Sequence, residues 1–456
     1  MPARPAALRD TDPLATPEAL EAARQFVRAH RWWQTAVFAI GLLTLVIVFS
    51  VLFLGVDNGP RDVRTSGPLA PVDSSQFAQD VASLVNAPIE HGGTVQIIDN
   101  GDAFVPALLR DIGSARRTIN FLVYIWEDGT FSNQVIDALI ERQQHGVAVR
   151  VLLDGLGGRK APDDRFEMLR RAGGRVERYR TPRFGTVTRF HRRNHRRSIV
   201  VDGEVGYVGG MAISDKWLGH AQDPDHWRDM MFRVTGPLAR SLQTAFVGSW
   251  VSTSGEILVG PSIYASTAPA APGVDRFIQH VNSPADDDQS MAYFYLMPIL
   301  AARKTVYLAT PYFIPDEPLR KALEKKAREG VDVRLLLPGR HIDNKWVRYS
   351  GQNHYDELMQ AGVRIYEYQP TFIHSKFAVF DGKWSIIGSP NLNSRSRQLD
   401  EENAFGIFDL TLGRQLEQTF FRDLGQSEEI QLDAWRKRNP FRRLLQEAAT
   451  LLDEQS

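Results

Sequence analysis

A histidine and a lysine stand two residues apart, at His374 and Lys376, in a run that alternates as a β-strand over residues 374–380. Side chains two residues apart on a strand share one face, so we expect the imidazole and the ammonium group side by side. This pair suits a phosphate, because one group can attack phosphorus while the other holds its anionic oxygens. Asp381 follows seven residues after the histidine. The spacing therefore predicts phosphoryl chemistry at this strand.

The first half of the chain carries a second pattern of the same kind. His195 and Arg197 again share the face of an expected strand, and Asp202 keeps the seven-residue spacing. Arginine stands where the later pattern has lysine, which keeps the positive charge. The chain contains 44 Arg and 10 Lys, so this choice fits a general bias toward arginine.

Each pattern continues into a glycine-containing turn. Gly209 and Gly210 follow the first pattern, whereas a glycine and Ser389 follow the second. Asn391 completes the second pattern, but Ala212 stands at the matching place in the first. The first pattern thus lacks an amide side chain that the second one has.

Two longer segments, 118–154 and 305–338, repeat the order strand, helix, strand. Their strands are short apolar runs with little polar alternation, as expected where helices cover both faces of a sheet. The threonines that open the segments are 187 residues apart, and the two histidines are 179 residues apart. Solenoid repeats have periods of about 20–50 residues, so this offset instead predicts a duplicated α/β unit.

Composition excludes several other kinds of site. The 456 residues include no cysteine, which removes disulfides, thiolate zinc sites, iron–sulfur clusters and cysteine nucleophiles. The 54 basic and 54 acidic residues give a net charge of +0, so a globally basic nucleic-acid binder is not indicated. A hydrophobic content of 43% excludes wholesale disorder.

A run of 25 residues at 32–56 contains no charged side chain. A membrane span needs roughly 20 apolar residues, so we expect a single-pass anchor with Trp32 and Trp33 at one interface. A cleaved signal peptide fits less well, because its apolar stretch would be about 7–15 residues long. Three arginines closely precede the run and two follow it, which favours a cytoplasmic N-terminus and a catalytic part on the outer face.

The pattern H-x-K-x4-D-x6-G-[GS]-x-N, present twice, resembles the signature of the phospholipase D superfamily. The second copy fits it fully, and the first departs from it at Arg197 and Ala212. The flanks at 310–317 and 387–396 are similar to bacterial cardiolipin synthases of that superfamily, and the resemblance covers about residues 95–445. It implies an α/β fold of two duplicated phospholipase D-like domains related by pseudo-twofold symmetry, with a shared active site between them.

These features together divide the chain into seven expected segments. They are an N-terminal cytoplasmic-side tail at 1–31, one transmembrane helix at 32–56, a linker at 57–75, a first phospholipase D-like domain at 76–262, an interdomain linker at 263–276, a second phospholipase D-like domain at 277–430, and a C-terminal basic amphipathic helix at 431–456. The last segment is either an interfacial helix or a helix packed on the domain.

The resemblance implies a two-step displacement at phosphorus that needs no metal or other cofactor. One histidine forms a phosphohistidine, and the other protonates the leaving alcohol and then deprotonates the acceptor. By analogy with the family, His195 is the expected nucleophile and His374 the expected acid and base. Asp229 and Glu402 match the positions of acidic residues that orient the two imidazoles.

The candidate catalytic set contains both patterns, with the two motif aspartates expected to hold strands and turns together. Its members are His195, Arg197, Asp202, His374, Lys376 and Asp381. Contacts to the phosphate or substrate are expected from Ser389, Asn391, Gly209 and Gly210.

The implied reaction joins two phosphatidylglycerol molecules into cardiolipin and releases glycerol, at the bacterial cytoplasmic (inner) membrane. The expected partners are an anionic phospholipid and an alcohol or second lipid as acceptor, with no nucleic acid. The sequence leaves the oligomeric state open. Three other interpretations remain: a phospholipase D-type hydrolase, another phosphodiesterase or nuclease, and a non-catalytic lipid-binding protein with a degraded first pattern. Net charge and the membrane run argue against nucleic acid.

Overall fold

A computed structural model describes residues 17–53, 63–179, 193–264, 273–282, 289–393, 395–396, 400–438 and 446. The chain forms two compact units, Met1–Asn58 and Gly59–Ser456. The first unit contains helix α1 (Pro17–Phe53). In the part of the chain that the structure describes, no helix has the length and apolar character required of a membrane span. The transmembrane helix expected at 32–56 is therefore not supported, and residues 54–56 of it lie outside the described residues.

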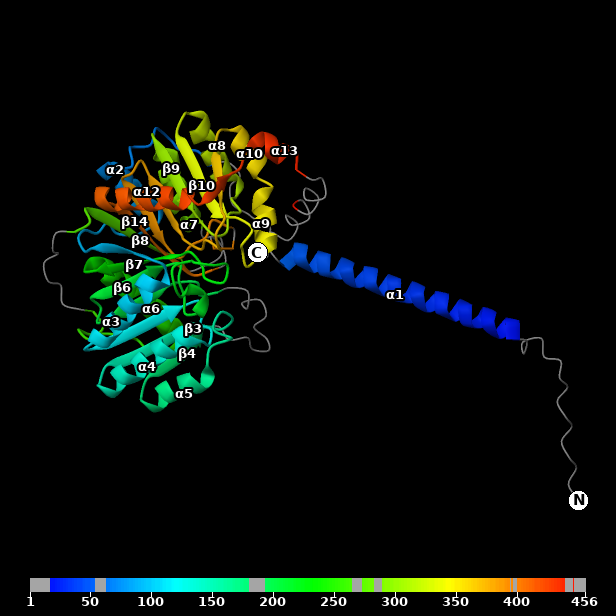
Figure 1. The fold of residues 1–456 in the computed structure, drawn as a ribbon, viewed down its shortest axis with the longest axis horizontal. Helices are drawn as coiled ribbons and strands as arrows, with labels where there is room; N and C mark the ends of the chain where they lie inside the picture. Colours follow the sequence, from blue (N-terminus) through cyan, green and yellow to red (C-terminus); the bar gives the residue numbers. More distant parts are fainter. Residues whose placement is uncertain are drawn as a thin grey trace, which may run out of the picture. The chain divides into compact units, whose positions relative to one another are not determined.

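The second unit contains two mixed sheets, each with helices on both faces (Figure 1). The first sheet has the strand order β1-β7-β6-β5-β2-β3-β4. Its strands are β1 (Val95–Asp99), β2 (Thr118–Val123), β3 (Ala148–Asp154), β4 (Arg175–Tyr179), β5 (Ser198–Val201), β6 (Val205–Gly209) and β7 (Met230–Thr235).

The second sheet has the order β15-β11-β10-β9-β12-β13-β14-β8. Its strands are β8 (Arg276–Asn282), β9 (Thr305–Ala309), β10 (Asp332–Pro338), β11 (Arg364–Tyr368), β12 (Phe377–Phe380), β13 (Trp384–Gly388), β14 (Glu402–Phe408) and β15 (Ser427–Glu429). Apart from β15 at one edge, each strand of this sheet has a counterpart in the same place in the first sheet. The expected duplication of an α/β unit is confirmed.

The helices form layers around these sheets. Each sheet together with its helices forms one lobe of the second unit. In the first lobe they are α3 (Asn100–Ser114), α4 (Thr130–Gln144), α5 (Asp163–Arg171) and α6 (Pro237–Ser254). In the second lobe they are α7 (Ser290–Ala301), α8 (Glu317–Arg328), α9 (Lys345–Gln352), α10 (Tyr355–Gln360), α12 (Leu410–Leu424) and α13 (Leu432–Arg436). Helices α4 and α5 cover the outer side of one lobe, and α8 and α10 that of the other (Figure 1).

The strands alternate between two apolar layers, because both faces of each sheet are covered. On β12, Ala378 and Phe380 face the outer core of the second lobe, whereas Phe377 and Val379 join a central core. That central core also takes Leu242 from α6 and residues of α12, so it joins the two lobes. This shared core thereby fixes β5, the strand of the first histidine pattern, and β12, the strand of the second.

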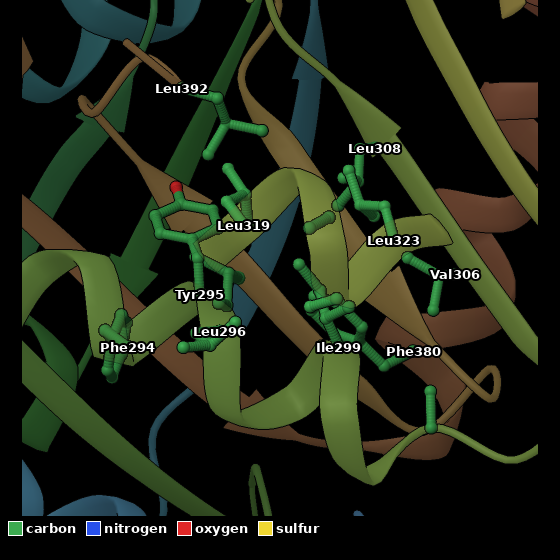
Figure 2. Close-up of a cluster of buried hydrophobic side chains, with 14 of the residues drawn as sticks. Phe294, Tyr295, Leu296, Ile299, Val306, Leu308, Leu319, Leu323, Phe380 and Leu392 are labelled. Carbon is green, nitrogen blue, oxygen red and sulfur yellow. The ribbon is translucent and has the colours of Figure 1, made fainter. Parts of the chain in front are cut away.

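The outer core of the second lobe fixes strand β9 (Figure 2). Phe294 and Ile299 of α7, Val306 and Leu308 of β9, and Leu323 of α8 are each at most 1% exposed. Full burial of such side chains contributes about 1.5–3 kcal/mol each. The chain continues from β9 to Tyr312, whose ring centroid lies 6.3 Å from that of His374, so this core also positions residues beside His374.

Three of the expected segments either differ from the structure or lie partly outside its described residues. Helix α2 (Ser75–Leu84) lies almost entirely within the segment 76–262, yet it packs on α7 in the core of the second lobe. Much of the interdomain linker at 263–276 and most of the C-terminal helix at 431–456 lie outside the described residues. The limits of the two domains stay predictions.

Candidate active site

The two histidines precede their motif strands instead of lying on them. Strand β12 begins at Phe377 and β5 at Ser198, so the strand expected over 374–380 is too long at its start. The reason is that the backbone before each strand pairs with the opposite lobe. The N–H of His195 donates to the carbonyl of Glu401 at 2.9 Å, and the N–H of His374 donates to the carbonyl of Arg228 at 2.7 Å.

Next to these backbone bridges, each histidine is hydrogen-bonded to a carboxylate from the other lobe. Nδ1 of His195 lies 2.8 Å from Oε1 of Glu402, and Nδ1 of His374 lies 2.7 Å from Oδ2 of Asp229. Each carboxylate directly follows the residue that pairs with the histidine backbone. Both imidazoles are buried, and the bonds at Nδ1 leave Nε2 as the nitrogen for chemistry in each ring.

The two carboxylates are anchored differently. The hydroxyl of Ser389 donates to Oε2 of Glu402 at 2.5 Å, whereas the indole N–H of Trp217 donates to Oδ2 of Asp229 at 2.8 Å. Gly210 occupies the position that corresponds to Ser389, and a Cβ atom there would collide with the carboxylate of Asp229. A side chain at 210 would therefore displace the carboxylate of Asp229, whereas the side chain of Ser389 holds the carboxylate of Glu402 by a hydrogen bond.

The two cationic residues also differ in their contacts. Nζ of Lys376 lies 3.0 Å from Nε2 of His374 and donates to its carbonyl oxygen at 3.1 Å. Nη1 of Arg197 donates to the carbonyl of His195 at 2.7 Å. Within the described residues, Nε and Nη2 of Arg197 have no hydrogen-bond partner, although the side chain is fully buried. This edge of the guanidinium can therefore donate two hydrogen bonds to a bound anion such as a phosphate.

Aromatic rings enclose the histidines, and sequence reasoning missed them. The ring centroid of Tyr124 lies 4.8 Å from that of His195, and the ring centroid of Tyr312 lies 6.3 Å from that of His374. The two tyrosines follow the equivalent strands β2 and β9, so the internal repeat itself could have indicated them. Trp227, with its ring centroid 5.5 Å from that of His374, has no counterpart that the repeat would reveal.

Burial disfavours the charged forms of the side chains at this site. Burial, then the nearby Lys376, lowers the pKa of His374 to about 4. Burial, then Arg197, holds the pKa of His195 well below its usual value. Burial also lowers the pKa of Lys376 to about 7 and raises the pKa of Glu402 to about 7. An anionic phosphodiester between the histidines would favour the protonated forms of both cationic groups and imidazoles.

The motif aspartates do not reach the histidines. The carboxylate of Asp202 accepts hydrogen bonds from the backbone N–H groups of residues 116–118, which lead into β2. Asp381 accepts from residues 303–305 before β9 in the same way. Both residues have positive φ, at 55° and 54°. The structure thus places them at turns, away from the imidazoles.

The remaining expected contacts lie at the end of β6 and in the turn after β13. Gly209 has φ 150°, and a Cβ atom there would collide with the carbonyl of Met230. Asn391 is buried, and its Oδ1 has no hydrogen-bond partner in the described part of the chain. Ala212, at the matching place, is buried without a polar side chain. Among the described residues, no group of three or more His, Cys, Asp or Glu side chains is arranged to hold a metal ion.

The family described as "Cardiolipin synthase, PLD-like domain" matches residues 108–250 and 295–424, one match in each lobe. The chain belongs to this family. The expected membership in the phospholipase D superfamily, on its cardiolipin synthase-like branch, is confirmed.

Relatives within this family extend over most of the chain. Cardiolipin synthase 2 of Bacillus anthracis is 34% identical over 357 residues, which is 78% of this chain and 69% of the relative. Cardiolipin synthase A of Pseudomonas fluorescens (strain SBW25) is 33% identical over 388 residues, covering 84% of this chain and 80% of the relative.

A solved structure shares the fold at lower identity. A phosphatidylserine synthase from Haemophilus influenzae Rd KW20 superposes with a TM-score of 0.62 at 15% identity, covering 84% of this chain and 100% of that one. At this identity the likeness shows the fold alone. It agrees with the two matched sheets of the second unit.

Proposed function

We propose that this chain is a phosphatidyltransferase that joins two phosphatidylglycerol molecules into cardiolipin and releases glycerol. The observation that carries the proposal is the pair of buried histidines, each bound at Nδ1 to a carboxylate from the other lobe. Membership in the cardiolipin synthase-like family and two relatives named cardiolipin synthase support the choice of substrate.

In the first step, Nε2 of His195 attacks the phosphorus of one phosphatidylglycerol. A P–N bond forms, and the P–O bond to the terminal glycerol breaks. The Nε2–H of protonated His374 gives its proton to the leaving alkoxide, so glycerol departs neutral. The assignment of His195 as the nucleophile follows the family analogy, and its low pKa keeps this imidazole neutral for attack.

In the second step, the hydroxyl of a second phosphatidylglycerol attacks the phosphohistidine. Neutral His374 takes the hydroxyl proton as the new P–O bond forms and the P–N bond breaks. The products are cardiolipin and free His195, and His374 ends the cycle protonated as it began. With water in place of the second lipid, the same step would give phosphatidic acid.

Bound phosphate supplies the charge balance that these steps require. Arg197 presents an unpartnered buried edge, and the ammonium group of Lys376 lies beside the imidazole of His374. Both cations can hold the equatorial oxygens of the phosphoryl group as negative charge develops there. The negative charge of the bound substrate in turn raises the pKa of His374 above about 4, which prepares it as an acid.

Membrane attachment through residues 32–56 is a further part of this proposal. It is supported by the uncharged run in the sequence and by a substrate that resides in a bilayer. A single pass with the catalytic part on the outer face of the bacterial cytoplasmic membrane fits the distribution of arginines. Carbonate extraction of membranes that contain the full chain tests the attachment: release of the chain into the soluble fraction would overturn it.

The reaction is tested with the full chain in detergent micelles that contain phosphatidylglycerol, with products identified by mass spectrometry. His374→Ala is the inactive control. We expect cardiolipin and glycerol in equal amounts from the wild type and neither from the control. Phosphatidic acid as the sole lipid product would make the protein a hydrolase. No turnover, with other phospholipids and added alcohols also inert, would overturn the enzymatic assignment.

A further inference from the structure

A cavity of about 590 Å³ lies in the second lobe, between the segment 63–69 and helices α7 and α8. It is large enough for a lipid headgroup, since ligand pockets commonly measure about 300–1,000 Å³. Its most prominent feature is positive charge. The basic lining residues are Arg64, Arg303, Lys321, Lys325 and Lys326.

The positive charge in this cavity is only partly balanced. None of the described residues that line it is acidic. Two glutamates stand beside it: Nζ of Lys321 lies 2.7 Å from Glu317, and Nζ of Lys326 lies 2.7 Å from Glu329. Nζ of Lys325 also lies 3.9 Å from Glu329, so the three lysines of α8 share two glutamates, and among the described lining residues Arg303 adds a further positive charge. Such a concentration favours an anionic ligand.

Another part of the cavity lining is apolar. Leu69, Leu296, Leu300 and Ala322 line it, and Leu296 and Ala322 belong to the buried core of this lobe. A free inorganic anion would gain nothing from such a wall. An amphiphile with a phosphate at one end and hydrocarbon at the other would meet both surfaces.

This cavity is separate from the candidate active site. Strand β9 runs from Thr305 to Ala309 and continues toward Tyr312, which lies beside His374. Arg303 precedes the strand, so it lies at the opposite end of β9 from the imidazole. None of the candidate catalytic residues is among the residues that line the cavity.

We propose that the cavity between 63–69, α7 and α8 binds the phosphate-bearing headgroup of an anionic phospholipid, as a second lipid site outside the active site. Basic side chains hold the phosphate, and the leucine wall accepts the first carbons of the lipid. The site goes beyond the proposed transferase reaction and does not depend on it. Because segment 63–69 forms one side of the cavity, a bound lipid also holds this segment against the lobe.

Photo-crosslinking tests the site with the full chain. The protein is mixed with phosphatidylcholine vesicles that contain a photoactivatable phosphatidylglycerol, and modified peptides are identified by mass spectrometry. We expect adducts on peptides from 63–69, α7 or α8, in addition to any on the active-site peptide with His374. Excess unlabelled phosphatidylglycerol should remove these adducts, whereas extra phosphatidylcholine or inorganic phosphate should not.

The variant Lys321→Gln/Lys325→Gln gives the matched comparison. Each basic residue near an anionic lipid is worth severalfold in affinity, so adducts on α7 and α8 should fall on the order of tenfold. The control is Lys160→Gln/Arg171→Gln, which removes two exposed charges from the first lobe and should change nothing.

Three results would overturn this site: adducts confined to the active-site peptide, equal losses in the variant and its control, or displacement by inorganic phosphate. The last would indicate a site for free anions. Cardiolipin formation is measured in the same samples, so failure of the transferase proposal would be seen separately from failure of this one.

Discussion

The two cationic residues of the motifs occupy similar places but offer different chemistry. Lys376 contacts the ring of His374, whereas Arg197 bonds the backbone of His195 and keeps Nε and Nη2 unpartnered. A guanidinium edge can hold two phosphate oxygens at once, and an ammonium group acts as a single point charge. A lysine at position 197 would restore the family pattern and yet lose this fork.

We therefore expect Arg197→Lys to lower kcat/KM for phosphatidylglycerol roughly tenfold or more, although the charge is kept. Initial rates of cardiolipin formation at low substrate measure the effect. Arg171→Lys, on an exposed face of α5, is the control and should behave as the wild type. An Arg197→Lys enzyme as active as the wild type would show that Arg197 acts as a point charge only.

A second prediction concerns the pH dependence of the free enzyme. Burial lowers the pKa of Lys376 to about 7, so this residue loses its positive charge as the pH rises through that value. Loss of the proton from His374, whose pKa is about 4, already lowers kcat/KM as the pH rises, and since the charged form of Lys376 holds the phosphate, the decline should become steeper above about pH 7. Arginine keeps its charge throughout, so Lys376→Arg should move this decline to higher pH, whatever its effect on the maximal rate.

The measurement is kcat/KM in mixed micelles from about pH 5.5 to about pH 9, because this quantity reports groups of the free enzyme. Wild type and Lys376→Arg are compared, with each rate normalised to its own maximum. An alkaline limb at the same pH in both proteins would assign that limb to another group.

Spacing in the sequence was sufficient to find the residue types at the site, because a histidine and a cation two apart share one face in any extended segment. It could not find which carboxylate serves which histidine. That depends on the bridges from His195 to Glu401 and from His374 to Arg228, which join residues more than a hundred positions apart. The ring of Trp227 was missed because it has no counterpart in the repeat, whereas Tyr124 could have been found from the repeat, although it belongs to neither motif.

Among the elements, the turns before β2 and β9 depend on the motif aspartates. The carboxylate of Asp202 accepts three backbone N–H groups from residues 116–118. An asparagine at this position would point its own NH2 donor at one or more of these backbone N–H donors, which would then lose their acceptor. Asp202→Asn should therefore lower the free energy of unfolding by about 1–3 kcal/mol. The folded fraction should keep kcat within roughly threefold of the wild type, because the carboxylate lies away from the imidazoles.

Thermal unfolding of Asp202→Asn and its kcat per folded molecule test this assignment, and Asp381→Asn provides the same test in the second lobe. A large loss of kcat without a loss of stability would return these aspartates to the catalytic set.

The sequence predicted the existence of the strands better than the residues at which they begin. The paired strands β2–β3 and β9–β10 were predicted because short apolar runs recur at one offset in both halves. The start of β12 was placed too early, since residues 374–376 alternate like a strand but hydrogen-bond across the lobes. Helix α2 joins the core of the second lobe for a similar reason: contacts distant in sequence decide its place.

Considered as a whole, the second unit builds one site from two incomplete lobes. Each lobe supplies one histidine, one cation and the carboxylate that the other histidine needs. This exchange divides the chemical roles between the lobes. Glu402 should govern the step in which His195 acts, and Asp229 the steps in which His374 acts.

A substrate with a good leaving group separates these roles. We expect Glu402→Gln and Asp229→Asn each to lower kcat with phosphatidylglycerol on the order of 100-fold, because both imidazoles lose their orienting carboxylate. A phosphatidyl ester of p-nitrophenol needs no proton on its leaving group. The first-turnover burst of p-nitrophenol should therefore be largely restored in Asp229→Asn, although steady turnover stays slow because the second step still needs His374, and the burst should remain low in Glu402→Gln.

Glu204→Gln, which changes an exposed glutamate of the first lobe, is the control and should match the wild type with both substrates. Mass spectrometry of the quenched reaction should find the phosphatidyl group on the peptide that contains His195 in Asp229→Asn. Rescue of Glu402→Gln instead, with the adduct on His374, would exchange the roles of the two histidines. Equal rescue of both variants would show that neither carboxylate is tied to one step, because a proton-independent substrate can relieve the loss of only one of two distinct functions.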